Sequence, residues 1–115
     1  MDTIEKTKIA VAAAADKKAI DIICLDISKI SSIADYFMIC SGSSTTQISA
    51  IADEIEDRLR KIGVKNYHRE GANGQYWILL DFGDLVVHVF NQETREYYDL
   101  ERLWGDAPRL TVNEG

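Results

Sequence analysis

The stretch YWILLDFGDLVVHVF, from Tyr76 to Phe90, decides the fold because it contains two alternating apolar segments joined by Gly83 and Asp84. A glycine in the first central position of a two-residue turn tolerates the positive φ that a type II′ β-hairpin requires. The resulting register gives one face made of apolar residues alone, which we expect to cover the core beneath a helix. This face carries Tyr76, Ile78, Leu80, Phe82, Leu85, Val87 and Val89.

The opposite face of the predicted hairpin mixes large apolar side chains with one acid and one imidazole. The same register places Trp77 opposite Phe90, Leu79 opposite His88 and Asp81 opposite Val86. Aromatic anchors among a few polar groups are typical of protein interfaces, so this face is a candidate binding surface. The alternative is that a further helix covers it, which makes His88 a satisfied core histidine.

The segments before the hairpin show helical and strand patterns in turn. Capping-box spacing at Asp2 and Ser44 begins two helices, the first reaching Lys18 and the second ending at Gly63 after apolar residues at helical intervals. Isoleucine-rich or alternating segments predict strands over 20–27, 36–41 and 64–70. With the hairpin, the expected fold is a single α/β domain over residues 1–115, with a mixed five-stranded sheet and flanking helices.

The residues after the hairpin predict one short helix over about 92–104, followed by a frayed tail from Asp106. Helical spacing places four large side chains on one side of this helix: Tyr97, Leu100, Leu103 and Trp104.

The composition favours a small protein of the cytoplasm. The chain has 115 residues, and 19 acidic against 13 basic residues give a formal charge of −6. This charge repels nucleic-acid phosphates and favours basic partners, although it also serves solubility alone. No signal peptide, presequence or membrane span is recognisable. Cys24 and Cys40 lie in apolar runs and are predicted to be buried, with a disulfide between neighbouring strands left open.

The chain offers one loop of the kind that can hold phosphate, at Ser41–Ser44 between a strand and a helix. It resembles the glycine-serine element of nucleotidyltransferases, which also need two closely spaced carboxylates to hold divalent metals. No such pair follows, because the acids of the hairpin turn diverge and those near residue 21 are five residues apart. We therefore expect a helix cap there, with no catalytic residue, no metal site and no cofactor.

Direct RNA binding is a further alternative, with poor support from the charge and from the absence of interleaved arginine and aromatic residues. It requires a basic patch, for which the available residues are Lys8, Lys61, Lys65 and Arg69. His68, in KNYHRE, is expected on a half-exposed strand.

Two long segments, Asp26–Ile55 and Glu70–Ala107, resemble the ribosome silencing factor family, whose members are also called Iojap-like proteins. WILLDFGDLVVHVF matches its most characteristic motif, with Phe82 where many relatives have tyrosine. The resemblance implies a nucleotidyltransferase-like fold without catalysis and docking on the fourteenth protein of the large ribosomal subunit, at the face that meets the small subunit. It further implies that subunit joining is obstructed and translation lowered when nutrients are limiting.

Together, the hairpin register and this resemblance give a hypothesis for the contact residues. The predicted partner-binding residues are Trp77, Leu79, Asp81, His88 and Phe90. Trp77 is expected to anchor the contact, and Asp81 to oppose basic residues of the ribosomal protein. The same surface could pair two free copies of the chain as a homodimer, and no membrane or sequence-specific nucleic-acid contact is expected. The alternative function is a nucleotidyltransferase-like phosphoryl-transfer enzyme.

Overall fold

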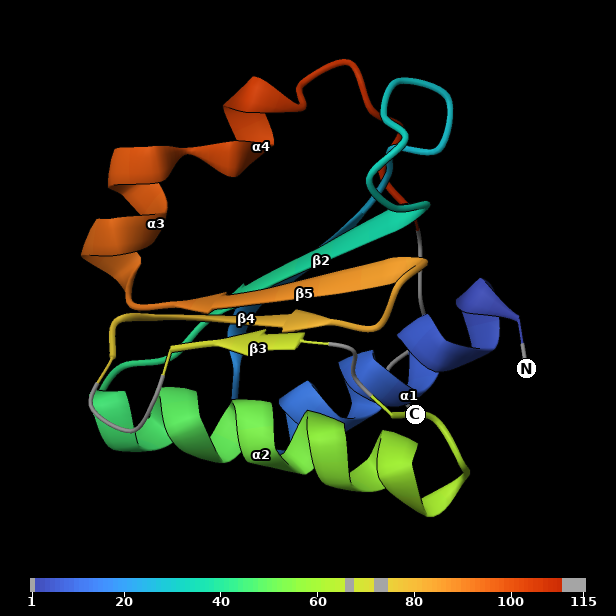
Figure 1. Cartoon of the computed structure of the whole chain (residues 1–115). Helices are drawn as coiled ribbons and strands as arrows, with labels where there is room; N and C mark the ends of the chain where they lie inside the picture. The colour runs from blue at the N-terminus through green and yellow to red at the C-terminus, as the bar shows by residue number, and fades with distance from the viewer. Residues whose placement is uncertain (1, 66–67, 72–74, 111–115) are drawn as a thin grey trace.

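The computed structural model describes residues 2–65, 68–71 and 75–110 and forms one mixed sheet with helices on both faces (Figure 1). The elements follow the predicted order, except that two helices replace the single predicted one at the C-terminus. They are α1 Thr3–Asp16, β1 Ile20–Asp26, β2 Tyr36–Ser41, α2 Thr45–Lys61, β3 His68–Glu70, β4 Trp77–Asp81, β5 Leu85–Phe90, α3 Gln92–Tyr98 and α4 Leu100–Leu103. The predicted α/β class and five-stranded mixed sheet are therefore confirmed.

The sheet has the strand order β1-β2-β5-β4-β3, in which β2 and β5 run parallel and every other neighbouring pair is antiparallel. Figure 1 shows α1 and α2 below the sheet and α3 and α4 on its other side. The apolar stripe of α2 at Ile48, Ile51, Ile55 and Leu59 is fully buried against the sheet, as amphipathic spacing predicts. The main core therefore lies between the sheet and the first two helices.

The hairpin forms with the predicted register, pairing Leu80 with Val87 and Leu79 with His88. Gly83 has a φ of 87°, the positive value that a type II′ turn requires, and the Phe82 N–H donates to the Leu85 carbonyl at 2.8 Å. The predicted core face is buried from residue 78 to residue 89. The assignment of Tyr76 to that face was wrong, because Tyr76 precedes the strand and is 58% exposed.

The ends of the helices also match the sequence signals. The Asp2 side chain accepts a hydrogen bond from the Glu5 N–H, and Ser44 accepts one from the Gln47 N–H. Gly63 follows α2 with a φ of 88°, the left-handed conformation expected of a residue just after a helix. Cys24 and Cys40 are buried free thiols, and burial raises the pKa of each to about 12, so neither is a reactive thiolate.

Two predicted boundaries in the chain's less regular segments were wrong. The strand predicted over 64–70 is confined to His68–Glu70, because the Val64 N–H still closes the end of α2 through the Leu59 carbonyl, and residues 66 and 67 lie outside the described residues. The predicted C-terminal helix breaks at Asp99, which adopts a left-handed φ of 47°. The break turns Tyr97 and Leu103 outward, at 80% and 70% exposure, so the predicted common face does not form.

The segment from Asp106 to Leu110 is not frayed. The Asp26 N–H donates to the Pro108 carbonyl at 2.8 Å, and the Leu110 N–H donates to the Cys24 carbonyl at 2.9 Å. Arg109 thereby forms an isolated antiparallel bridge along the outer edge of β1. The predicted fraying of residues 111–115 lies outside the described residues.

A buried arginine ties the C-terminal helices to the sheet. Arg95 of α3 is only 6% exposed, and its guanidinium donates to the Ser41 hydroxyl and to the Asp21 carbonyl, each at 2.8 Å. Its Nε donates to the Glu101 carboxylate at 3.1 Å. Asp21 has a positive φ of 50° and lies where the pairing of β1 is irregular, and the arginine donates a hydrogen bond to its main-chain carbonyl there.

Candidate functional site

One face of the sheet packs against α1 and α2. The opposite face is covered over β1, β2 and β5 and accessible over β4 and β3. Leu100, Trp104 and Ala107 pack over β1, β2 and β5, with the Trp104 ring 5.6 Å from that of Phe37. Side chains of β4 on this face are only half-buried, and those of β3 are exposed. We call the accessible part, formed by His68, Glu70, Trp77, Leu79 and Asp81, the β3–β4 face.

The five predicted partner-binding residues share one face but differ in depth. Trp77, Leu79 and Asp81 are half-buried and reach the surface of the β3–β4 face. His88 and Phe90, on β5, are 4% and 1% exposed and lie buried beside it, with their rings against that of Trp77. The predicted alternative, a covering helix, thus describes part of the face, because α4 and the segment after it cover the β5 side. We assign His88 and Phe90 to the support under Trp77 rather than to the outer surface.

Aromatic packing holds Trp77 in place. Its ring centre lies 4.9 Å from that of Phe90 and 4.7 Å from that of Tyr98 on α3. The indole Nε1–H donates to His88 Nδ1 at 3.2 Å, which requires that nitrogen to be unprotonated. The Trp77 side chain is therefore held in one orientation within the folded chain.

His88 is held in its neutral form. Burial lowers the pKa of its imidazole from 6.5 to about 4, because the charged form loses its hydration there. Its Nε2 has no hydrogen-bond partner within the described part of the chain, and the ring packs at 4.8 Å from the edge-on ring of Phe37. Protonating His88 would place a charge in an apolar pocket and remove the acceptor that Trp77 uses.

The pKa of His88 predicts a loss of stability in mild acid. Between about pH 6.5 and pH 4 the unfolded chain binds a proton that the native chain does not, so the free energy of unfolding falls as the pH is lowered. The expected fall is about 2 kcal/mol between pH 7 and pH 5, since one pKa unit corresponds to about 1.4 kcal/mol. Urea denaturation of the parent chain at pH 7, 6 and 5 measures it.

The matched controls use the two histidines of the chain. His88→Leu should lose this part of the pH dependence whatever its own stability, whereas His68→Gln, on an exposed residue, should retain it. An unchanged slope in His88→Leu would show that another group causes the dependence.

Three residues of this region were not predicted from the sequence to belong to it. His68 and Glu70 join the face because β3 pairs them with Asp81 and Leu79, and the His68 Nε2 and Glu70 Oε1 atoms are 2.6 Å apart. Tyr98 joins it by packing on Trp77. The register of β3 could have indicated the first two, but no sequence signal fixed that register.

The Ser41–Ser44 loop is occupied by internal contacts. Ser41 is fully buried and bonded to Arg95, Ser43 donates to the Gln47 side chain at 2.8 Å, and Ser44 caps α2. A Cβ on Gly42 would come within 2.9 Å of Ile48, so the loop packs directly against the helix. The interpretation as a helix cap is confirmed.

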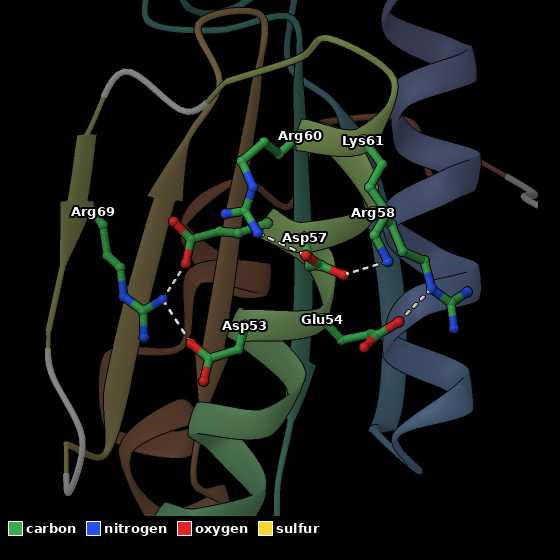
Figure 2. Close-up of polar contacts among 8 residues, drawn as sticks. Asp53, Glu54, Asp57, Arg58, Arg60, Lys61 and Arg69 are labelled. Carbon is green, nitrogen blue, oxygen red and sulfur yellow. Dashed lines mark hydrogen bonds and ion pairs between the residues drawn. The ribbon is translucent and has the colours of Figure 1, made fainter.

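Arg69 and the basic residues of α2 itself are paired with acids of that helix (Figure 2). Arg69 bonds to Asp53 and Glu56, and Lys61 lies 3.0 Å from Asp57. Two of the four residues available for an RNA-binding patch are therefore paired with carboxylates.

Over residues 2–65, 68–71 and 75–110, no group of three or more histidine, cysteine, aspartate or glutamate residues could hold a metal ion. In the same ranges, no helix is both long enough and apolar enough to cross a membrane.

Comparison with known proteins gives consistent matches over the whole chain. A family model described as "Ribosomal silencing factor during starvation" (RsfS) matches residues 1–115. The chain is 50% identical over 108 residues to ribosomal silencing factor RsfS of Bacillus subtilis, covering 94% of this chain and 92% of that protein. It is 36% identical to the chloroplastic protein Iojap of Zea mays, covering 87% of this chain and 43% of that protein. A crystal structure of a Chromobacterium violaceum protein, 37% identical, superposes with a TM-score of 0.89 over 100% of this chain and 95% of the other.

Proposed function

This chain belongs to the ribosomal silencing factor family, and on that premise we propose that it binds the large ribosomal subunit through that subunit's fourteenth protein. Binding at the surface that meets the small subunit would block subunit joining and repress translation when nutrients are limiting. The β3–β4 face carries this proposal, because it combines a fixed aromatic anchor with an accessible acid.

The chemistry of the face suits a basic protein partner. Trp77 and Leu79 supply apolar area, while Asp81 and Glu70 supply negative charge around it. One Asp81 oxygen already accepts the Gly83 N–H at 2.8 Å, so the turn holds this carboxylate in a fixed position. The overall charge of −6 acts in the same sense by attracting a basic protein.

We infer that the chain acts by binding rather than by catalysis and does so in the cytoplasm. The internal contacts of the Ser41–Ser44 loop support binding without catalysis, since its hydroxyls already bond within the protein. A calorimetric titration of folded protein with nucleotide and magnesium tests the phosphoryl-transfer alternative, which requires metal-dependent binding. Free protein could also pair through the β3–β4 face, and sedimentation velocity over a range of concentrations would reveal such a homodimer.

Sucrose-gradient sedimentation of purified ribosomal subunits tests the main proposal. At a magnesium concentration that permits joining, the protein should travel with large subunits and reduce the joined peak in proportion to its occupancy. Protein that stays at the top of the gradient, with joining unchanged, would contradict the proposal. If the protein binds large subunits but joining is undiminished, the proposed binding would stand and the proposed block of joining would be contradicted.

A further inference from the structure

A groove lined by aromatic rings lies beside the β3–β4 face, between the start of β4 and α3. Its walls carry the rings of Tyr76, Trp77, Tyr97 and Tyr98 and the polar residues Gln75, Glu93 and Thr94. We call it the aromatic groove.

The rings of the aromatic groove are unusually accessible for large side chains. Tyr76, Tyr97 and Tyr98 are 58%, 80% and 50% exposed. The Tyr97 and Tyr98 rings meet edge to face at 5.1 Å, and Tyr98 in turn packs on Trp77. Single exposed aromatic residues need no explanation, but a contiguous group in a concave surface is typical of an interaction site.

The two walls of the groove are fixed to each other. The Asn91 N–H donates to the Tyr76 carbonyl at 2.9 Å, and the Asn91 side chain caps α3 by accepting the Thr94 N–H at 2.9 Å. The buried Arg95 holds α3 on the sheet from its other side. A partner side chain would therefore enter a groove that needs little rearrangement.

Charge indicates which side chain fits. Glu93 is the one charged residue among the described residues that line the groove, and it is an acid. A guanidinium group is planar, stacks on aromatic faces and binds a carboxylate through two parallel hydrogen bonds, which lysine does not reproduce. A phosphate, in contrast, would meet a carboxylate and no cation there.

We propose that the aromatic groove receives an arginine side chain from a basic segment of the ribosomal partner protein, stacked on the tyrosine rings and paired with Glu93. This rests on the proposed function, because the groove shares Trp77 with the β3–β4 face and so extends the same contact. The groove would add specificity at the edge of the contact, while Trp77 remains its anchor.

Charge reversal on α3 gives a matched test. Glu93 lies in the groove, whereas Glu96, three residues later and also exposed, lines a separate cleft with Asp21 and Arg109. Dissociation constants of the full chain for purified large subunits are measured for Glu93→Lys, Glu96→Lys, Tyr97→Ala and Tyr97→Phe. Glu93→Lys should weaken binding about tenfold and Tyr97→Ala about fivefold, with Glu96→Lys and Tyr97→Phe within about twofold of the parent.

The sign of the Glu93→Lys effect separates the possible occupants. Stronger binding by Glu93→Lys than by Glu96→Lys would place ribosomal RNA at the groove and overturn the proposal, because the new cation would approach phosphates. If Glu93→Lys and Glu96→Lys weaken binding equally, the effect comes from long-range attraction alone, and the proposal is also overturned. Tyr97→Phe as weak as Tyr97→Ala would identify the hydroxyl, not the ring, as the contact and would overturn the proposed stacking.

The test also separates this inference from the function on which it rests. If Trp77→Ala loses binding while the groove variants keep it, the proposed function stands and the groove inference fails. If the parent chain itself does not bind large subunits, the proposed function fails and the groove inference fails with it.

Discussion

Trp77→Ala is expected to weaken binding to large ribosomal subunits by about thirtyfold or more. The indole is fixed by Phe90, Tyr98 and the hydrogen bond to His88, so it presents apolar area and loses little conformational entropy on binding. Truncating such a preorganised aromatic anchor commonly costs about 2 kcal/mol or more of binding free energy, which corresponds to this change in affinity. Titration of labelled protein with purified large subunits measures the dissociation constant.

The control for Trp77→Ala removes an exposed apolar side chain elsewhere. Ile33 is 69% exposed and lies outside the β3–β4 face, so Ile33→Ala should bind as the parent does. Because Trp77 is half-buried, circular dichroism and thermal denaturation must first show that the variant is folded at the assay temperature. A folded Trp77→Ala chain with parental affinity would remove the β3–β4 face from the proposed contact.

Arg95→Leu should lower the free energy of unfolding by about 3 kcal/mol and the melting temperature by about 10 °C. The change leaves the Ser41 hydroxyl, the Asp21 carbonyl and the Glu101 carboxylate without the guanidinium that satisfies them. Breaking a buried, hydrogen-bonded charge network by removing one partner is among the most costly single substitutions. Thermal and urea denaturation give the two quantities, with the temperature shift scaled for a domain of this size.

Two further arginine variants show whether the network itself is responsible. Arg102, on α4, is exposed, so Arg102→Leu should change stability by less than about 0.5 kcal/mol. Arg95→Lys keeps the charge but not the planar set of donors, and should fall between the parent and Arg95→Leu. Equal stability of Arg95→Leu and Arg102→Leu would contradict the structural role of the buried guanidinium.

The parts of the fold that could be predicted are those specified by neighbours in sequence. The hairpin register follows from a two-residue turn and strict alternation, because a slip by one residue would expose the whole apolar face. The stripe of α2 and the caps at Asp2 and Ser44 are likewise local patterns, and all three formed where expected. Local chemistry is therefore sufficient to specify these elements.

The errors lie where distant contacts decide the local conformation. Asp99 breaks the helical pattern so that Leu100 and Trp104 can pack on the sheet, although the residue spacing alone favours a continuous helix. The segment after Asp106 has no strand pattern, yet β1 offers it backbone partners. Nothing near Arg95 in the sequence indicates that residues 54 and 74 positions away would bury it.

For the candidate site, the alternation of side chains predicts which residues share a face but not how deeply each one is buried. Alternation placed Trp77, Leu79, Asp81, His88 and Phe90 together, and β4–β5 pairing does so in the structure. Depth depends on α4 and on the segment after it, which cover β5 and leave β4 accessible. The strand that completes the face, β3, has only three residues and carries too weak a pattern to be aligned from sequence.

The segment that follows α4 protects one edge of the sheet against the addition of strands from other chains. An exposed strand edge is a template on which further chains can add, one strand after another, into fibrils. Here the Pro108 and Leu110 backbones occupy the outer edge of β1, an irregular stretch near Asp21 interrupts the rest, and the opposite edge is a short strand of charged or polar residues. Neither edge of the sheet therefore offers a long, regular backbone for open-ended strand addition, so the chain can carry the accessible β3–β4 face without polymerising through its sheet.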